Sequence, residues 1–153
     1  MIPDLKPLLD WAATRRWPDM PARVRQRARW ILADDLAAMI AARFEPEVEA
    51  YRHLVEGRAS VREATIVGPG LPRTDRWQAA SANGLAITWC ELDEEFRLAT
   101  CHAGAYAIPA LLAEADTGNL TLADVLTSLA VSYECVTRFA TCFRSQVPRV
   151  HAH

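Results

Sequence analysis

Hydrophobic residues recur every three or four positions along most of the chain, and this spacing predicts helices rather than strands. The clearest case covers residues 21–44, where an arginine-rich face lies opposite the apolar positions. Those apolar positions are Val24, Ala28, Ile31, Leu32, Met39 and Ile40. A shorter helix precedes this segment and is ended by Trp17-Pro18, and a weaker amphipathic helix over residues 45–56 follows it.

After these helices the pattern changes for a few residues and then becomes helical again. Residues 64–67 are β-prone and run into a turn. Thr74 or Asp75 can cap the next helix, which is rich in small residues that let another helix approach closely. A further helix is predicted over residues 103–115, although Pro109 would remove one of its hydrogen bonds.

The last predicted helix covers residues 122–143 and is apolar on most faces. Thr121, with Asp124 three residues on, resembles a capping box at its start. A helix of this kind is buried or packs against another surface. We therefore expect an apolar patch that includes Leu129 and Phe139, and we expect the chain to self-associate or to bind a second chain through it.

The segments together indicate one domain. There is no internal repeat, low-complexity segment or long linker, and 153 residues are enough to bury one hydrophobic core. We predict an all-α, bundle-like single domain of about six helices over residues 1–153.

Composition excludes several classes of partner. The formal net charge is −2 and the arginines are interspersed with acids, so we expect no nucleic-acid binding. No apolar run approaches the ~20 residues of a membrane span, and residues 1–10 do not resemble a signal peptide. These features indicate a soluble, cytoplasmic protein without membrane attachment.

Cysteines and lysines limit the chemistry further. Cys90, Cys101, Cys135 and Cys142 are far apart and form no C-x-x-C pair, so neither a zinc site nor a redox motif is indicated, and reduced thiols are expected. Lys6 is the only lysine.

The densest group of acids is Glu91, Asp93, Glu94 and Glu95. It crowds the C-terminal end of a predicted helix, where the helix dipole disfavours negative charge. One interpretation is a solvated acidic helix end. The other is a carboxylate that points into a pocket and acts as an acid, a base or an orienting partner. A hard-metal site is a third, weakly indicated possibility, because the glycine and spacing of a calcium loop are missing.

His102 follows this acidic run in a predicted loop. Histidine is suited to proton transfer and a carboxylate can fix its tautomer, although a surface or capping role is the alternative. We predict that Asp93 and His102 lie within roughly 8 Å of each other if they act together. His53 is expected on the surface, and His151 and His153 in a terminal tail.

Several motifs resemble, in order and spacing, the signature of the MmgE/PrpD family, which includes 2-methylcitrate dehydratase and cis-aconitate decarboxylase. They are Ala82-Asn83-Gly84, Glu91-Leu92-Asp93-Glu94, His102-Ala103-Gly104, Ile108 to Glu114, and Tyr133-Glu134-Cys135 with Arg138. The chain departs from the signature at Glu94, where the family usually has Asp, at Ala103 in place of proline, and at Ser132 in place of glycine.

The resemblance implies a cofactor-independent lyase, a dehydratase or decarboxylase, that moves a proton next to a carboxylate of a small polycarboxylate. An epimerase or isomerase of the same family is the alternative. His102 would be the acid/base residue and Asp93 its orienting or acid/base partner, with Glu91 and Glu94 as second choices. The implied substrate-binding residues are Asn83, Arg97 and Thr100.

Family members are about three times as long as this chain, so the resemblance covers only the N-terminal helical part, and the family's lid domain is expected to be missing. Three hypotheses follow. The chain is a subunit or fragment of such a lyase, completed as a homodimer or by a complementary subunit; or it is a non-catalytic helical dimerisation module; or it is a small enzyme that uses the acidic run with a metal. Under the first hypothesis the isolated chain is incomplete as an enzyme.

Overall fold

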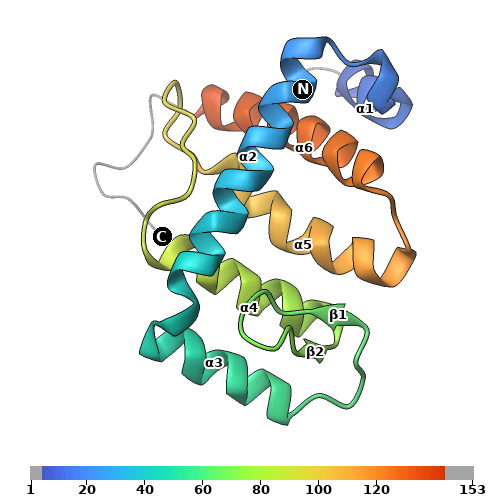
Figure 1. Ribbon diagram of the computed structural model, residues 1–153. Helices are drawn as coiled ribbons and strands as arrows, with labels where there is room; N and C mark the ends of the chain where they lie inside the picture. Colours follow the sequence, from blue (N-terminus) through green and yellow to red (C-terminus); the bar gives the residue numbers. More distant parts are fainter. Residues whose placement is uncertain (1–4, 144–153) are drawn as a thin grey trace.

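The computed structural model describes residues 5–143, which form an all-helical domain with one very short pair of strands (Figure 1). In that range the elements are α1 (Lys6–Thr14), η1 (Trp17–Asp19), α2 (Ala22–Ala41), η2 (Ala42–Phe44), α3 (Pro46–Gly57), β1 (Ala64–Thr65), β2 (Arg73–Thr74), α4 (Arg76–Trp89), α5 (Ala103–Gly118) and α6 (Leu122–Cys142). The all-α class and the six predicted helices are confirmed.

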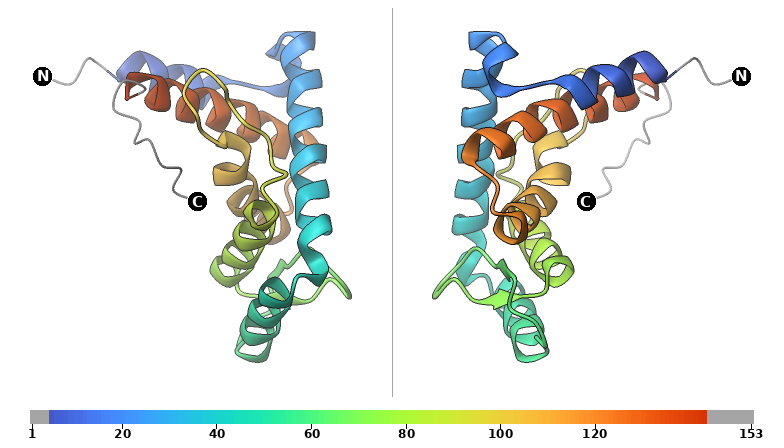
Figure 2. Two further views of the ribbon diagram at one scale, coloured as in Figure 1. Left: turned by 90° about the vertical axis from the view of Figure 1, so that its left-hand side faces the viewer. Right: turned by 90° about the vertical axis from the view of Figure 1, so that its right-hand side faces the viewer.

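Helices α4 and α5 form the centre of the packing, and α6 lies against α5. The long helix α2 runs along one side of the molecule and contacts α4, α5 and α6 (Figure 2). Helix α3 and the strand pair pack against α4 at the end of the molecule away from α1 and α6 (Figure 1). The core is therefore shared by four helices, each of which contributes one fully buried large side chain: Met39, Ile87, Ile108 and Leu129.

Helix ends follow the capping residues in the sequence. Of the two residues that could cap α4, Asp75 does so, because its side chain accepts hydrogen bonds from the backbone N–H groups at positions 77 and 78. Thr121 and Asp124 form the reciprocal capping box at the start of α6. Pro109 does not end α5; it is buried there and faces Gly84 of α4, where the absence of a side chain leaves room for the ring.

Helix α6 is less exposed than its sequence suggests. Leu129 is fully buried against α2 and α5, so it belongs to the core and not to an external patch. Phe139 and Phe143, near the end of the helix, are about half exposed. No helix between residues 5 and 143 combines the length and apolar character needed to cross a bilayer. His151 and His153 lie outside the described residues.

Candidate active site

The acidic residues lie in the loop between α4 and α5, residues 90–102, which we call the acidic loop. Phe96 and Cys101 pair across this loop in an isolated antiparallel bridge, in which the N–H of Phe96 donates to the carbonyl of Cys101 at 2.8 Å. Near its two ends, Glu91 and Thr100 adopt left-handed backbone conformations, with φ of 50° and 43°. Non-glycine residues rarely adopt this conformation, so the surrounding structure must hold the loop in one shape.

Asp93 and His102 meet at the base of the acidic loop. Oδ2 of Asp93 lies 2.9 Å from Nδ1 of His102, so the two side chains form an ion pair when the imidazole is protonated. The atoms are close but are not aligned as in a hydrogen bond. The Asp93 side chain is fully buried, whereas that of His102 is 16% exposed. The predicted proximity is confirmed, and only the histidine of the pair reaches the surface.

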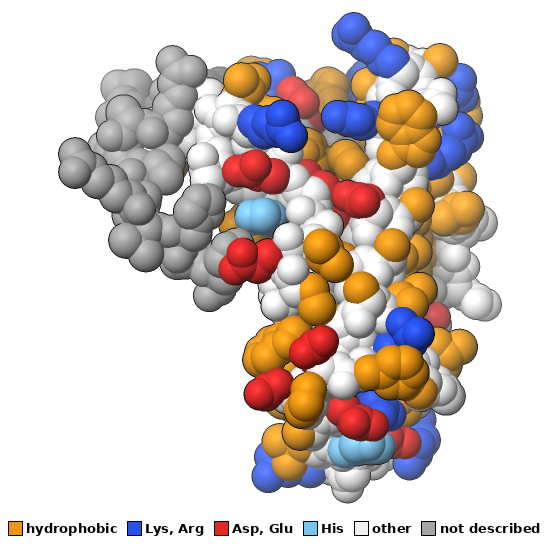
Figure 3. All heavy atoms as spheres, turned by 60° about the vertical axis from the view of Figure 1, so that its left-hand side comes forward, with side chains coloured by type: hydrophobic (Ala, Val, Ile, Leu, Met, Phe, Trp, Pro, Cys, Tyr) orange, Lys and Arg blue, Asp and Glu red, His pale blue; other side chains and the backbone are white. Residues whose placement is uncertain are grey.

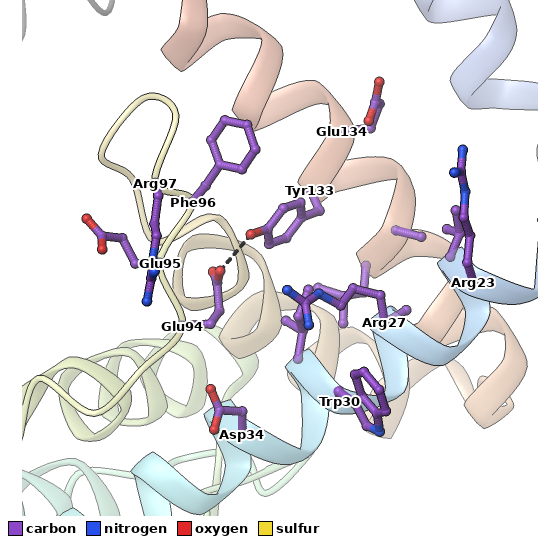
Figure 4. Close-up of a pocket in the computed structure, with 15 residues that line it drawn as sticks. Arg23, Arg27, Trp30, Asp34, Glu94, Glu95, Phe96, Arg97, Tyr133 and Glu134 are labelled. Atoms are coloured by element: carbon purple, nitrogen blue, oxygen red, sulfur yellow. Dashed lines mark hydrogen bonds between the residues drawn. The ribbon is translucent and has the colours of Figure 1, made fainter.

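Glu94 binds the N-terminus of α5. Its Oε1 accepts a hydrogen bond from the backbone N–H of Gly104 at 2.6 Å, and its Oε2 accepts one from the hydroxyl of Tyr133 at 2.7 Å (Figure 4). Burial raises the pKa of Glu94, and these two hydrogen bonds partly oppose that effect. The N-terminus of α5 thus favours the negative charge that the C-terminal end of α4 would disfavour.

A further carboxyl group, Asp35, lies beneath the acidic loop. It is fully buried on α2, and its Oδ1 accepts a hydrogen bond from the backbone N–H of Glu94 at 3.2 Å. No hydrogen-bond donor within residues 5–143 reaches its Oδ2. Burial raises the pKa of Asp35 from its ordinary 3.8 to about 7, and the acids Glu94, Asp93 and Asp34 add to this increase by repulsion.

Gly104 allows the two carboxyl groups to come this close. A Cβ at this position would overlap Oδ2 of Asp35 and lie 2.9 Å from Cγ2 of Ile31 and 3.1 Å from Oε1 of Glu94. The first turn of α5 therefore packs directly on both carboxyl groups, and any side chain here would displace at least one of them.

Sequence reasoning did not identify Asp35, Gly104 or Tyr133 as part of this arrangement. A signal for Asp35 was present, because it shares its helical register with Leu32 and Met39 on the buried face of α2. An acid in such a register is a buried polar group that needs an explanation. Which groups Gly104 and Tyr133 meet depends on tertiary packing.

The remaining predicted site residues do not join the pair. Glu91, Arg97 and Thr100 are exposed on the acidic loop. Asn83, expected to bind substrate, is fully buried: its side chain accepts from the N–H of Val67 at 2.8 Å and donates to the carbonyl of Thr65 at 3.0 Å. We correct that assignment, because Asn83 fastens the strand pair to α4 and has no surface to offer a substrate. His53, predicted on the surface, is exposed.

An open cleft of about 1070 Å³ lies between α2, the acidic loop and α6 (Figure 4). Its lining residues include Arg23, Arg27, Arg97, Asp34, Glu94, Glu95, Glu134, Trp30, Phe96 and Tyr133. Neither Asp93 nor His102 lines it, so we locate the candidate site by the carboxylate–histidine pair rather than by the cleft. In the view of Figure 3, acidic side chains lie among hydrophobic ones over the middle of the face, and Lys and Arg gather towards its ends.

Within residues 5–143, no group of three or more His, Cys, Asp or Glu side chains is arranged to hold a metal ion. The four cysteines are free thiols, and burial raises the pKa of Cys101.

Comparison with known proteins identifies the chain. Residues 6–153 match the family description "MmgE/PrpD N-terminal domain". A curated relative, the cis-aconitate decarboxylase-like protein oryM of Aspergillus oryzae, is 27% identical over 134 residues, which cover 83% of this chain and 28% of the relative. This chain therefore spans little more than a quarter of the length of the curated relative. No solved structure matches. Because the family match covers nearly the whole chain and the fold agrees, the chain belongs to the MmgE/PrpD family through its N-terminal domain.

Proposed function

We propose that this chain supplies the N-terminal helical domain of a cofactor-independent, cytoplasmic lyase that acts on a small polycarboxylate of the methylcitrate or aconitate type. The observation that carries the proposal is the 2.9 Å approach of Asp93 to His102 at the base of the acidic loop. Family membership and the decarboxylase-like name of the relative support the reaction class.

His102 is the group that would move the proton. With Nδ1 turned towards Asp93, the carboxylate fixes the orientation of the ring and favours a proton on Nδ1. Exchange with substrate then proceeds through Nε2. Because the Asp93 side chain is fully buried, water screens the pair weakly and the attraction is stronger than it would be on the surface.

The two reactions of the proposal use this proton in opposite directions. In dehydration, His102 removes a proton from the carbon next to a carboxylate, the carbon–carbon double bond forms, and the hydroxyl group takes a proton back from His102 and leaves as water. In decarboxylation, the bond to the leaving carboxylate breaks, carbon dioxide departs, and the carbon that keeps the electron pair takes a proton from His102. Epimerisation, the alternative, needs removal and return of one proton at the same carbon.

A polycarboxylate also needs positive charge. On the acidic loop, Arg97 is an exposed cation, whereas Lys6 is on α1 and pairs with Asp10. We propose that further cations come from a partner, either a second copy in a homodimer or a complementary subunit, because positioning and charge stabilisation make large contributions to rates of this kind.

The test measures proton transfer to or from carbon, which all three reactions share. The full polypeptide that the cell makes is incubated in deuterated water with cis-aconitate, 2-methylcitrate or citrate, and proton NMR follows deuterium incorporation, alkene formation and loss of a carboxylate. We expect His102→Asn to lower the rate by about 10²–10⁴-fold, the contribution of a positioned acid/base group.

The matched control is His53→Asn, because His53 is an exposed histidine on α3 that contacts Glu49, Arg52 and Glu56 of its own helix. It should leave the rate unchanged. Equal rates for His102→Asn and the wild-type protein would refute the acid/base role. With 2-methylcitrate or citrate, deuterium incorporation without alkene formation or carboxylate loss would favour the epimerase alternative.

A further inference from the structure

A pair of carboxyl groups lies next to Asp93 and His102 and has no part in the proton transfer described above. It consists of Asp35, in the middle of α2, and Glu94, in the acidic loop. Both side chains converge on Gly104 in the first turn of α5, where a single added Cβ would overlap the Asp35 carboxyl group and contact that of Glu94. Two acids thus meet at a point from which other side chains are excluded.

The hydrogen-bond donors around the pair differ for its two members. Glu94 receives two, the N–H of Gly104 at 2.6 Å and the hydroxyl of Tyr133 at 2.7 Å, one on each carboxylate oxygen. Asp35 receives only the N–H of Glu94, at 3.2 Å on Oδ1. Its Oδ2 is buried and no donor in the described chain reaches it.

This difference indicates where one proton resides. An ionised carboxylate is stable in a protein interior when donors satisfy both of its oxygens, as they do for Glu94. A buried oxygen without a donor suits a carboxylic acid, which carries its own hydrogen and can donate it. The surroundings therefore fit an anionic Glu94 and a neutral Asp35.

We propose that Asp35 is a positioning residue that keeps one proton beside an anionic Glu94 at Gly104, and that this pair of acids holds the acidic loop where Asp93 meets His102. The catalytic meaning of this positioning rests on the proposed function. The protonation of Asp35 does not rest on it, because it is argued from the donors and the burial alone.

The connection to the Asp93–His102 pair is short. Glu94 follows Asp93 directly, and its backbone N–H is held by Asp35. Gly104, whose N–H is held by Glu94, comes two residues after His102. Asp93 and His102 therefore each lie within two residues of a backbone N–H group that donates a hydrogen bond to Asp35 or Glu94. Loss of the Asp35 proton would place a third anion beside Asp93 and Glu94 and drive the loop away from α2.

The charged groups around the carboxyl pair and its neighbours Cys101 and Tyr133 are mainly acidic. They are Asp34 and Arg27 from α2, Asp93 and Glu95 from the acidic loop, and His102 at the start of α5. The strongest influences on Asp35 after burial and its hydrogen bond are three acids, Glu94, Asp93 and Asp34. His102 favours the ionised form of Glu94. The surrounding charges therefore also favour the proton on Asp35 rather than on Glu94.

The test is a carbon-13 NMR titration of the side-chain carboxyl groups in the full chain, with Asp34→Asn as a matched control on the same helix. In the wild-type chain we expect Asp35 to titrate near neutrality and the carboxyl resonance of Glu94 to shift again in that pH range, because a neighbouring charge appears there. Asp35→Asn should abolish this second shift and leave the main titration step of Glu94 in place, because asparagine is as neutral as the protonated Asp35. Asp34→Asn should leave both steps in place.

The positioning is measured separately by amide hydrogen exchange. Asp35→Asn keeps an acceptor for the N–H of Glu94 and should leave its exchange within a few-fold of wild type, whereas Asp35→Ala should accelerate it at least about tenfold. If Asp35→Ala does not fold, the wild-type and Asp35→Asn titrations still decide the question.

An Asp35 that titrates near its ordinary value in the folded chain, or a Glu94 shift near neutrality that persists in Asp35→Asn, would overturn the proposal. Equal exchange at Glu94 in the wild-type chain and Asp35→Ala would overturn the positioning role. A proton held by Asp35, found together with full turnover by His102→Asn, would support the carboxyl pair and refute the proposed function. An Asp35 of ordinary acidity, found together with loss of turnover in His102→Asn, would support the lyase and refute the carboxyl pair.

Discussion

Replacing Asp35 with asparagine should stabilise the chain, and the gain should grow as the pH rises. Burial raises the pKa of Asp35 from 3.8 to about 7, so the folded chain binds this proton more tightly than the unfolded chain does. The stability that the proton supplies is complete below about pH 4 and is lost as the pH rises to about 7. Above that pH, the folded chain holds a buried carboxylate that asparagine would replace with a neutral group.

The size of the effect follows from the change in pKa. A difference of about three pH units, at 1.36 kcal/mol each, corresponds to about 4 kcal/mol, and this is an upper limit because the titration is coupled to that of Glu94. We therefore expect Asp35→Asn to raise the free energy of unfolding by about 2–4 kcal/mol at pH 8, and by less than about 1 kcal/mol at pH 4, where Asp35 is already neutral.

Urea unfolding followed by far-ultraviolet circular dichroism at about pH 4, 5.5 and 8 measures this difference. Asp34→Asn is the control, because Asp34 is exposed and its substitution should change the free energy by no more than about 0.5 kcal/mol. A loss of stability in Asp35→Asn at pH 8, or a gain of equal size at every pH, would refute the reasoning.

Four further substitutions test the groups next to the carboxyl pair and the apolar residues of α6. Gly104→Ala should cost about 1–3 kcal/mol in urea unfolding, because its Cβ overlaps the buried carboxyl group of α2; an unchanged midpoint would show that this group moves aside freely. Tyr133→Phe removes a donor from Glu94 and should cost about 1–3 kcal/mol at neutral pH, less in acid where that carboxylate is protonated; equal costs at both pH values would contradict this. Leu129→Glu should prevent folding, as judged by circular dichroism, because Leu129 is fully buried. Phe139→Glu should leave the free energy of unfolding within about 0.5 kcal/mol of wild type and should lower the sedimenting mass if the chain self-associates. A wild-type chain that sediments as a monomer at micromolar concentration would exclude self-association.

The helices were predictable because their signals are local. Periodic apolar residues and the caps at Asp75 and Thr121 need only a few neighbouring positions, and the structure places α4 and α6 accordingly. The end of α2 differs slightly: the predicted helix extends through residue 44, but its last three residues tighten into the 3-10 turn η2. The objection raised by Pro109 also failed, because Gly84 on a different helix provides the space that its ring needs.

The site was predictable only in part. The proximity of Asp93 and His102 was expected because the helices on either side bring the two ends of the acidic loop back towards each other, and it is confirmed. Asn83 was assigned to substrate because it belongs to a motif, and nothing local shows that its amide bonds to a strand pair. Asp35 carried a signal in its helical register. Its meeting with a second acid at Gly104 could not be predicted, because it depends on how α2 packs on α5, and local patterns do not encode that packing.

The hydrogen bonds of the Asp35–Glu94 pair should form late in folding. The hydrogen bond from Glu94 to Asp35 joins residues 59 apart in sequence, and that from Tyr133 to Glu94 joins residues 39 apart. Helices α4, α5 and α6 are consecutive and can dock across the single loops that join them, whereas α2 must close over a longer intervening segment before Asp35 reaches the acidic loop. Burying an acid is also unfavourable until its hydrogen-bond donors are in place. A partly folded chain would therefore retain its helical signal while Asp93 and His102 remained unorganised, and the proposed proton transfer would be the last property to return on refolding.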